Sequence, residues 1–99
     1  SIAYSTYLKD AIEQAMFHFT NFRVRRIICI VTDGHCSDSR DALEVADMAK
    51  KTGIEIMTIG TEDADLEFLK KLSSKPKLAL AAKSNELESG IREMALLLN

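Results

Sequence analysis

The chain has 99 residues, of which 46% are hydrophobic and 28% charged, and its formal net charge at pH 7 is -2. This length and composition predict one globular domain or part of one. The negative charge argues against nucleic acid and anionic membranes as partners, and no apolar run approaches the roughly 20 residues that a membrane-spanning helix needs.

The first third of the chain predicts a helix followed by a buried strand. Apolar residues recur at helical spacing over residues 7–21, which indicates an amphipathic helix. The run IICIV at residues 27–31 is typical of a strand that is buried on both faces of a parallel sheet. It continues directly into Thr32, Asp33 and Gly34. In open parallel sheets ligands bind beyond the carboxyl ends of the strands. Asp33 comes directly after such an end and is therefore a candidate binding residue.

The rest of the chain predicts two further strands and three further helices. They are a helix between the N-cap residues 37–39 and Gly53, a strand at 54–60, a short helix opened by Asp63 and Asp65, a weaker strand at 78–82, and a last helix capped by Ser84. Alternation with long connections forces parallel pairing and right-handed crossovers. We therefore predict an α/β fold: a three-layer, Rossmann-like, mostly parallel sheet with helices on both faces.

The strand at 27–31 has an unusual place in this scheme. It is the most apolar strand, yet no predicted strand precedes it, and three parallel strands are few for such a sheet. We therefore predict that residues 1–99 are the rear portion of a single, larger doubly wound domain. An uncovered edge along this strand also predicts self-association.

Residues 30–76 carry the most distinctive motifs of the chain. They read IVTDGHCSDSRDALEVADMAKKTGIEIMTIGTEDADLEFLKKLSSKP. A strand ending in TDG, a polar loop and helix, the strand GIEIMTIG and the acidic helix EDADLEFLKKL follow one another in this segment. In this order they resemble the second half of a von Willebrand factor type A (VWA) domain, and the similarity extends over roughly residues 3–98.

The resemblance implies a metal-ion-dependent adhesion site (MIDAS), which holds a divalent cation at the carboxyl end of the sheet. Family members build this site from an Asp-x-Ser-x-Ser loop, a threonine before a helix and an aspartate after a strand. Thr6, in YSTYLKDAI, matches the threonine, and Asp33 matches the aspartate. The residues beside them are Ser5, Gly34 and His35. Thr6 is also typical of a helix N-cap, a role that is compatible with ligation.

Two features depart from the family pattern. No Asp-x-Ser-x-Ser loop occurs in these 99 residues. Tyr4 and Ser5 stand where the family usually has a pair of glycines before its threonine. The site is therefore incomplete within this sequence. We expect Mg²⁺ or Mn²⁺ in the complete domain, and weak binding or none by two protein ligands alone.

The function implied by the resemblance is divalent-metal-dependent binding of another protein, in adhesion or in assembly. Mg²⁺ takes oxygen ligands in octahedral geometry, so a hydroxyl and one carboxylate leave positions that an acidic side chain of the partner completes. Such a site needs no catalytic base, and we expect no enzymatic activity. We expect neither nucleic acid nor a membrane as a partner.

Two alternatives remain open. An aspartate at a strand end, here Asp33, is also typical of Mg²⁺-dependent phosphoryl-accepting or phosphotransfer domains, in which Lys83 would be the lysine after a later strand. Those folds need an earlier pair of acidic residues, which is missing here just as the Asp-x-Ser-x-Ser loop is. The other alternative is a VWA-like scaffold that holds no metal.

The cysteines and histidines predict no further site. His35 and Cys36 are adjacent, but the remaining ligands that zinc prefers are Cys29, within a strand, and His18, on the polar face of the first helix. Two cysteines in such different surroundings predict no disulfide. We therefore expect a reducing, cytoplasmic location.

Overall fold

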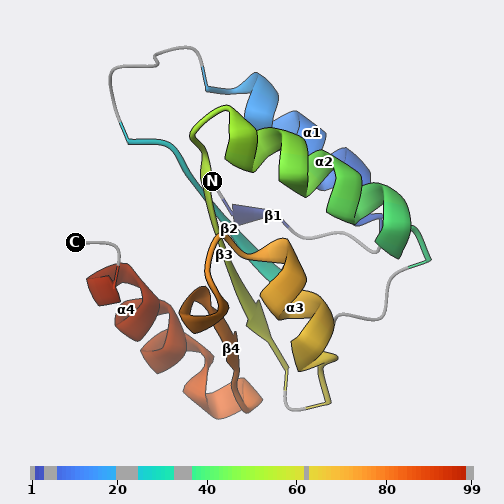
Figure 1. The fold of residues 1–99 in the computed structure, drawn as a ribbon. Coiled ribbons are helices and arrows are strands. Elements are labelled where there is room, and N and C mark those ends of the chain that lie inside the picture. Colours follow the sequence, from blue (N-terminus) through green and yellow to red (C-terminus); the bar gives the residue numbers. More distant parts are fainter. Residues whose placement is uncertain (1, 4–6, 20–24, 33–36, 62, 98–99) are drawn as a thin grey trace.

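The fold is that of a computed structural model, which describes residues 2–3, 7–19, 25–32, 37–61 and 63–97 (Figure 1). Within these residues the strands are β1 (Ile2–Ala3), β2 (Ile27–Thr32), β3 (Glu55–Gly60) and β4 (Ala79–Ala81). The helices are α1 (Leu8–Phe17), α2 (Ser39–Lys51), α3 (Leu66–Leu72) and α4 (Leu87–Leu97), with short 3-10 turns η1 (Pro76–Leu78) and η2 (Ser84–Glu86). All neighbouring strands pair in parallel, in the order β1-β2-β3-β4. The predicted α/β class with a parallel sheet is confirmed.

The sheet contains a strand, β1, that the sequence pattern does not predict. The prediction that no strand precedes residues 27–31 is wrong, because Ile2 and Ala3 of β1 pair with Cys29 and Ile30 of β2. A two-residue strand is too short to show the alternating period by which strands are recognised. β2 pairs over its whole length with β3, from Ile27 opposite Glu55 to Thr32 opposite Gly60.

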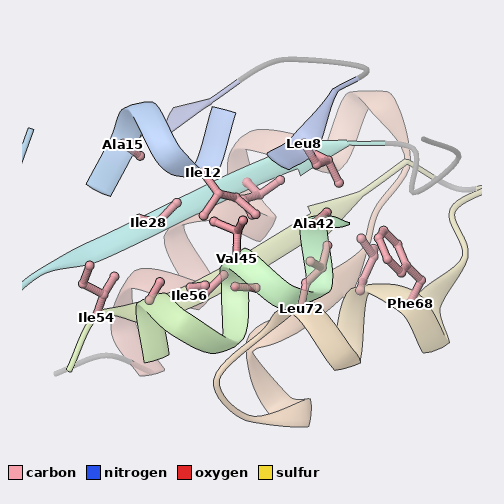
Figure 2. Close-up of a cluster of buried hydrophobic side chains, with 14 residues drawn as sticks. Leu8, Ile12, Ala15, Ile28, Ala42, Val45, Ile54, Ile56, Phe68 and Leu72 are labelled. Carbon is pink, nitrogen blue, oxygen red and sulfur yellow. The ribbon is translucent and has the colours of Figure 1, made fainter. Parts of the chain in front are cut away.

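Successive side chains of each strand point to opposite sides of the sheet, and a hydrophobic cluster covers each side. One face carries Ile28, Ile30 and Ile56, which pack under α1, α2 and α3 (Figure 2). The members of this larger core cluster are Leu8, Ile12, Ala15, Ile28, Ile30, Ala42, Val45, Ala46, Ala49, Ile54, Ile56, Phe68, Leu69 and Leu72. The other face carries Cys29, Val31, Met57 and Ile59, against which Ile91 of α4 packs. This two-sided burial explains why both long strands read as continuous apolar runs.

The helix ends follow the local signals in most places. Gly53 has φ 90°, and its N–H donates to the carbonyl of Lys50, so it ends α2 as predicted. The carboxylate of Asp65 accepts from the N–H of Phe68 at 3.2 Å and caps α3. Within the described residues α1 ends at Phe17 rather than at residue 21, and α4 begins at Leu87, after a 3-10 turn rather than directly at Ser84.

Candidate metal centre

The predicted metal ligands lie outside the part of the chain that the structure describes. Thr6 and Asp33 are both in this position, as are the adjacent Ser5, Gly34 and His35. What the structure describes are the segments next to them: α1 begins two residues after Thr6, and β2 ends at Thr32, directly before Asp33. Their roles as ligands therefore stay predictions.

The segments that flank the two predicted ligands are joined by one carboxylate, that of Asp38. Its Oδ1 accepts from the backbone N–H of Leu8 at 3.2 Å, and its Oδ2 accepts from that of Lys9 at 2.9 Å. The contacts are partly buried and connect residues that are 30 and 29 positions apart. The beginning of α1 and the beginning of α2 therefore lie side by side.

Asp38 replaces the cap that the sequence predicted for α1. The N-cap residue of α1 is Tyr7, not Thr6, and the Tyr7 side chain makes no capping hydrogen bond. The first two N–H groups of the helix are satisfied by Asp38 instead. Asp38 itself occupies the N-cap position of α2, yet its side chain does not cap that helix. The sequence predicted only that Asp38 caps its own helix, α2, because no local pattern links Asp38 to α1.

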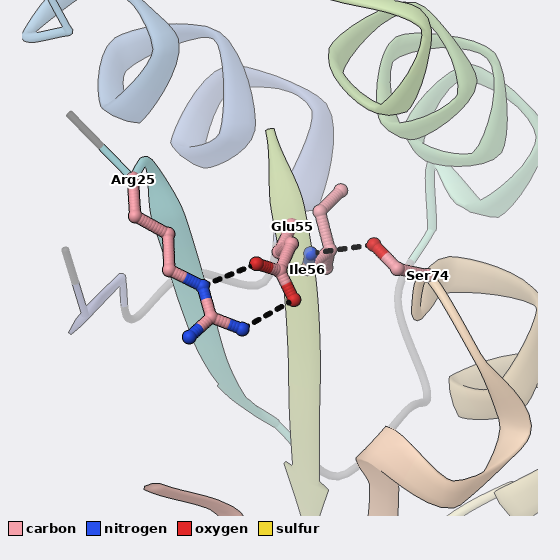
Figure 3. A network of polar contacts seen from close by, with 4 residues as sticks. All are labelled: Arg25, Glu55, Ile56 and Ser74. Atoms are coloured by element: carbon pink, nitrogen blue, oxygen red, sulfur yellow. Dashed lines mark hydrogen bonds and ion pairs between the residues drawn. The ribbon is translucent and has the colours of Figure 1, made fainter. Parts of the chain in front are cut away.

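Further polar contacts lie at the amino-terminal end of the strands, where β2 and β3 begin (Figure 3). Arg25 donates from Nε to Glu55 Oε1 at 2.5 Å and from a terminal nitrogen to Oε2 at 3.1 Å. This hydrogen bond lowers the pKa of the Glu55 carboxyl and raises the pKa of the Arg25 guanidinium. Arg26 is buried and donates to the carbonyl oxygen of Thr52. These cations serve the structure of the sheet at the end away from the predicted metal site.

The described surface offers no rival metal site. Across residues 2–3, 7–19, 25–32, 37–61 and 63–97, no three His, Cys, Asp or Glu side chains gather closely enough to hold a metal ion. A hollow of about 310 Å³ between α1 and α2 is mainly apolar and is lined by Glu13, Met16, Phe17, Val45 and Met48. No described helix combines the length and the hydropathy that crossing a bilayer requires.

The donor set fits a hard divalent cation in kind but not in number. A threonine hydroxyl and an aspartate carboxylate are the oxygen ligands that Mg²⁺ and Mn²⁺ accept in proteins. Thr6 and Asp33 would hold the ion, and the ion would supply a point of attachment for an anionic group of a partner.

Comparison with known proteins decides the family. A family model described as the von Willebrand factor type A domain matches residues 3–93, which is most of the chain. The chain belongs to the von Willebrand factor type A family. This VWA chain is similar to mouse matrilin-2, with 45% identity over 69 residues that cover 67% of this chain and 7% of matrilin-2.

Solved structures share the fold of this VWA chain. A manganese-loaded TRAP protein of Plasmodium vivax superposes with a TM-score of 0.71 at 21% identity, covering 91% of this chain and 40% of that one. Proximal thread matrix protein 1 of the mussel byssus gives a TM-score of 0.73 at 21% identity, with coverages of 92% and 24%. The mussel protein has also been solved with zinc occupying its MIDAS motif, and that structure gives a TM-score of 0.63 at 20% identity, covering 86% of this chain and 23% of that one.

The comparison corrects the expected location. The matrilins that match this VWA chain are secreted proteins of the extracellular matrix, which points to an extracellular rather than a cytoplasmic location. The expectation rested on the absence of a disulfide framework. That is a weak signal, because a close-packed parallel sheet of this kind needs no disulfide to bury a core.

Proposed function

We propose that this VWA domain binds another protein through a divalent cation, Mg²⁺ or Mn²⁺, that Thr6 and Asp33 help to hold. Membership of the family supports a metal-dependent adhesion or protein-interaction module in general terms. The chain spans only 7% of matrilin-2, so the partner itself is not carried over from that relative. An acidic side chain of the partner completes the coordination sphere, since two protein oxygens leave most of the octahedral positions open.

The observation that carries the proposal is the bridge from Asp38 to α1. Its contacts with the Leu8 and Lys9 amides at 3.2 and 2.9 Å hold together the two segments that flank the predicted ligands. A hydroxyl and a carboxylate from distant parts of the sequence serve one ion only if their segments meet. The bridge supports such a meeting at the end of the sheet where parallel folds build their sites.

We further propose that residues 1–99 are the rear portion of the domain and that an Asp-x-Ser-x-Ser loop precedes them in the full-length protein. The loop is missing from this sequence, and two ligands are too few for tight binding. The domain works by binding and not by catalysis, in keeping with the non-enzymatic VWA domains of the matrilins.

The test uses the full-length protein and a partner captured in the presence of Mg²⁺. We expect a chelator to release the partner and Mn²⁺ to restore binding. Asp33→Ala should abolish metal-dependent binding while leaving the unfolding temperature nearly unchanged, because a carboxylate after a strand contributes little to the core. Asp41→Ala is the matched control, since Asp41 is exposed in the first turn of α2 and its loss removes the same charge.

Partner binding that survives both the chelator and Asp33→Ala would reject the proposal. That outcome would favour the metal-free scaffold, in which the VWA fold presents a binding surface without an ion. If the chelator releases the partner but the Asp33→Ala variant still binds it, partner binding depends on the metal and Asp33 is not one of the ligands.

A further inference from the structure

We propose that the hollow between α1 and α2 is a second docking site of this domain, which takes a basic amphipathic segment of another protein and needs no metal ion. A bulky apolar side chain of that segment fills the hollow, and a neighbouring lysine or arginine contacts the carboxylate of Glu13. The hollow has a volume of about 310 Å³ and is lined by Glu13, Met16, Phe17, Val45 and Met48.

The hollow is part of a groove, because α1 and α2 lie side by side on one face of the sheet (Figure 1). Their beginnings are joined by the bonds from Asp38 to the amides of Leu8 and Lys9. Residues 16–17 of α1 and 45–48 of α2, nearer the ends of both helices, line the hollow. The two helices therefore run in the same direction. A groove of this kind accepts the apolar face of a further amphipathic helix.

The apolar side chains at the hollow form an exposed rim over a buried floor. Phe17 is 86% exposed and Met48 is 60% exposed. Val45 is buried within the core beneath them, and Met16 packs against that core. Exposed apolar side chains that gather at one hollow are typical of interaction sites, and methionine adapts its shape to the group that it contacts. The floor is thus fixed by the core, while the rim can adjust to an anchor.

The charge at the hollow is negative. Glu13 is the charged residue of the lining, and its side chain is half exposed. It lies 3.7 Å from the ammonium of Lys9, which is also half exposed, so this ion pair is weak. A cation of a partner can therefore take the place of Lys9 when the apolar anchor beside it excludes water from Glu13.

The turns next to the hollow add to this negative charge. Asp10 on α1 and Glu44 on α2 are exposed, and each lies one turn before a residue of the lining. The ion pairs among the described residues include neither of these two carboxylates. Arg40 and Asp41, at the start of α2, carry opposite charges and add no net charge. The groove therefore favours basic residues beside the anchor over acidic ones.

The experiment measures the binding of a synthetic helical peptide to the full-length protein by fluorescence anisotropy. The peptide carries leucines along one face and lysines beside them, and a second peptide has glutamates in place of the lysines. We expect the lysine peptide to bind equally well with and without a chelator of divalent cations. We expect the glutamate peptide to bind at least about tenfold more weakly, because its charges repel those of the groove.

Variants test whether the peptide lies in the groove. Phe17→Ser and Met48→Ser should each weaken binding of the lysine peptide by at least about tenfold, the loss that an anchoring residue typically shows. Glu13→Gln should reduce the difference between the two peptides. Leu96→Ser and Glu93→Gln are the matched controls and should bind as the wild type does. Both residues are exposed on α4, which packs on the other face of the sheet.

Oxidation of methionine tests what covers the hollow. Peroxide should oxidise the exposed thioether of Met48 in the full-length protein, and the bound lysine peptide should slow this oxidation. Met57 is buried in β3 and is the internal reference, which should resist peroxide with and without the peptide.

Five outcomes would overturn the proposal, and none depends on the proposed metal site. Met48 that resists peroxide without peptide shows that another part of the full-length protein covers the hollow. Self-association in sedimentation that Phe17→Ser abolishes shows that a second copy of the chain covers it. Loss of peptide binding in the chelator places the peptide elsewhere. Equal binding of the two peptides removes the role of charge, and equal losses in Phe17→Ser and Leu96→Ser remove the role of the hollow.

Discussion

At the scale of single residues, the pair of Arg25 and Glu55 shows how a surface contact acquires a defined geometry. Both oxygens of the carboxylate are engaged by one guanidinium, which gives the fork-to-fork arrangement that arginine forms with carboxylates (Figure 3). The pair joins the first residue of β3 to the residue two before β2. Its side chains are 47% and 31% exposed, so solvent and salt screen much of its attraction.

The Arg25–Glu55 pair predicts a pH dependence of stability. The hydrogen bond from Arg25 holds the pKa of Glu55 below the ordinary value of 4.5, so near that pH the unfolded chain binds more protons than the folded one. The pair therefore stabilises the fold above pH 4.5, and the contribution is lost as the pH falls through the lowered pKa of the folded state. In denaturant unfolding of the full-length protein, Glu55→Gln should be less stable than wild type at pH 7. The difference should shrink towards pH 3 and in high salt, and a difference that is independent of pH would contradict this origin.

The thiol of Cys29 is expected to be unreactive in the folded protein. It is 9% exposed within β2, and burial raises the pKa of the thiol, so both access and the thiolate form are limited. Iodoacetamide should leave Cys29 unlabelled in native protein and label it fully in denaturant. Cys36 lies outside the described residues; we expect it to react in the native state, and not to be bridged to Cys29. Rapid native labelling in a Cys36→Ser variant would contradict the close packing of β2.

At the scale of elements, Ser74 completes the sheet where β4 does not reach. β4 pairs with β3 only at Thr58, Ile59 and Gly60. Earlier along β3, the N–H of Ile56 donates to the Ser74 hydroxyl at 2.8 Å (Figure 3). The carbonyl of Ile56 accepts from the Ser74 N–H at 2.9 Å. Ser74, two residues after the end of α3, thus imitates a strand partner and satisfies both backbone groups of buried Ile56.

Removing the Ser74 hydroxyl should be costly for so small a change. Ser74→Ala leaves the N–H of fully buried Ile56 without its acceptor, and an unsatisfied buried donor costs about 1–3 kcal/mol. We expect a loss of this size in the free energy of unfolding of the full-length protein. Ser89→Ala in α4 is the control, because Ser89 is exposed and should change stability by less than about 0.5 kcal/mol. Equal effects of the two substitutions would show that the hydroxyl of Ser74 is dispensable.

At the scale of the whole molecule, the two long edges of β2 are covered unequally. On one side all six residues of β2 pair with β3, whereas on the other β1 pairs with Cys29 and Ile30. Unpaired strand edges recruit further strands. The short β1 reduces the exposed edge that the sequence predicted, but within the described residues it does not cover the length of β2.

We therefore expect the isolated 99-residue chain to self-associate or to be poorly stable. Sedimentation should show association that increases with concentration. The full-length protein, in which we propose that a further strand covers this edge, should not associate through it under the same conditions. A stable monomer of the 99-residue chain, with amides at 27–31 protected from exchange, would contradict this expectation.

The sequence alone predicted the elements whose signals lie within a few residues of one another. The helical period of α1 and α2, the continuous apolar runs of β2 and β3, the glycine that ends α2 and the aspartate that caps α3 are local patterns. The parallel topology followed from the alternation of these elements. The motifs after Val31 indicated the VWA family, which the family comparison confirms over residues 3–93. Thr6 and Asp33 came from the same motifs and remain predictions.

Only the tertiary structure decided how distant residues are used. Asp38 caps α1 instead of its own helix, Ser74 pairs with Ile56, Arg26 is buried against Thr52, and β1 joins β2. Each of these contacts joins residues 18 to 30 positions apart. The carboxylate of Asp38 can accept hydrogen bonds from the first N–H groups of α1 or of α2 equally well. Its partner is set by which helix end the packed core brings within hydrogen-bonding distance, and no local pattern of residues records that distance.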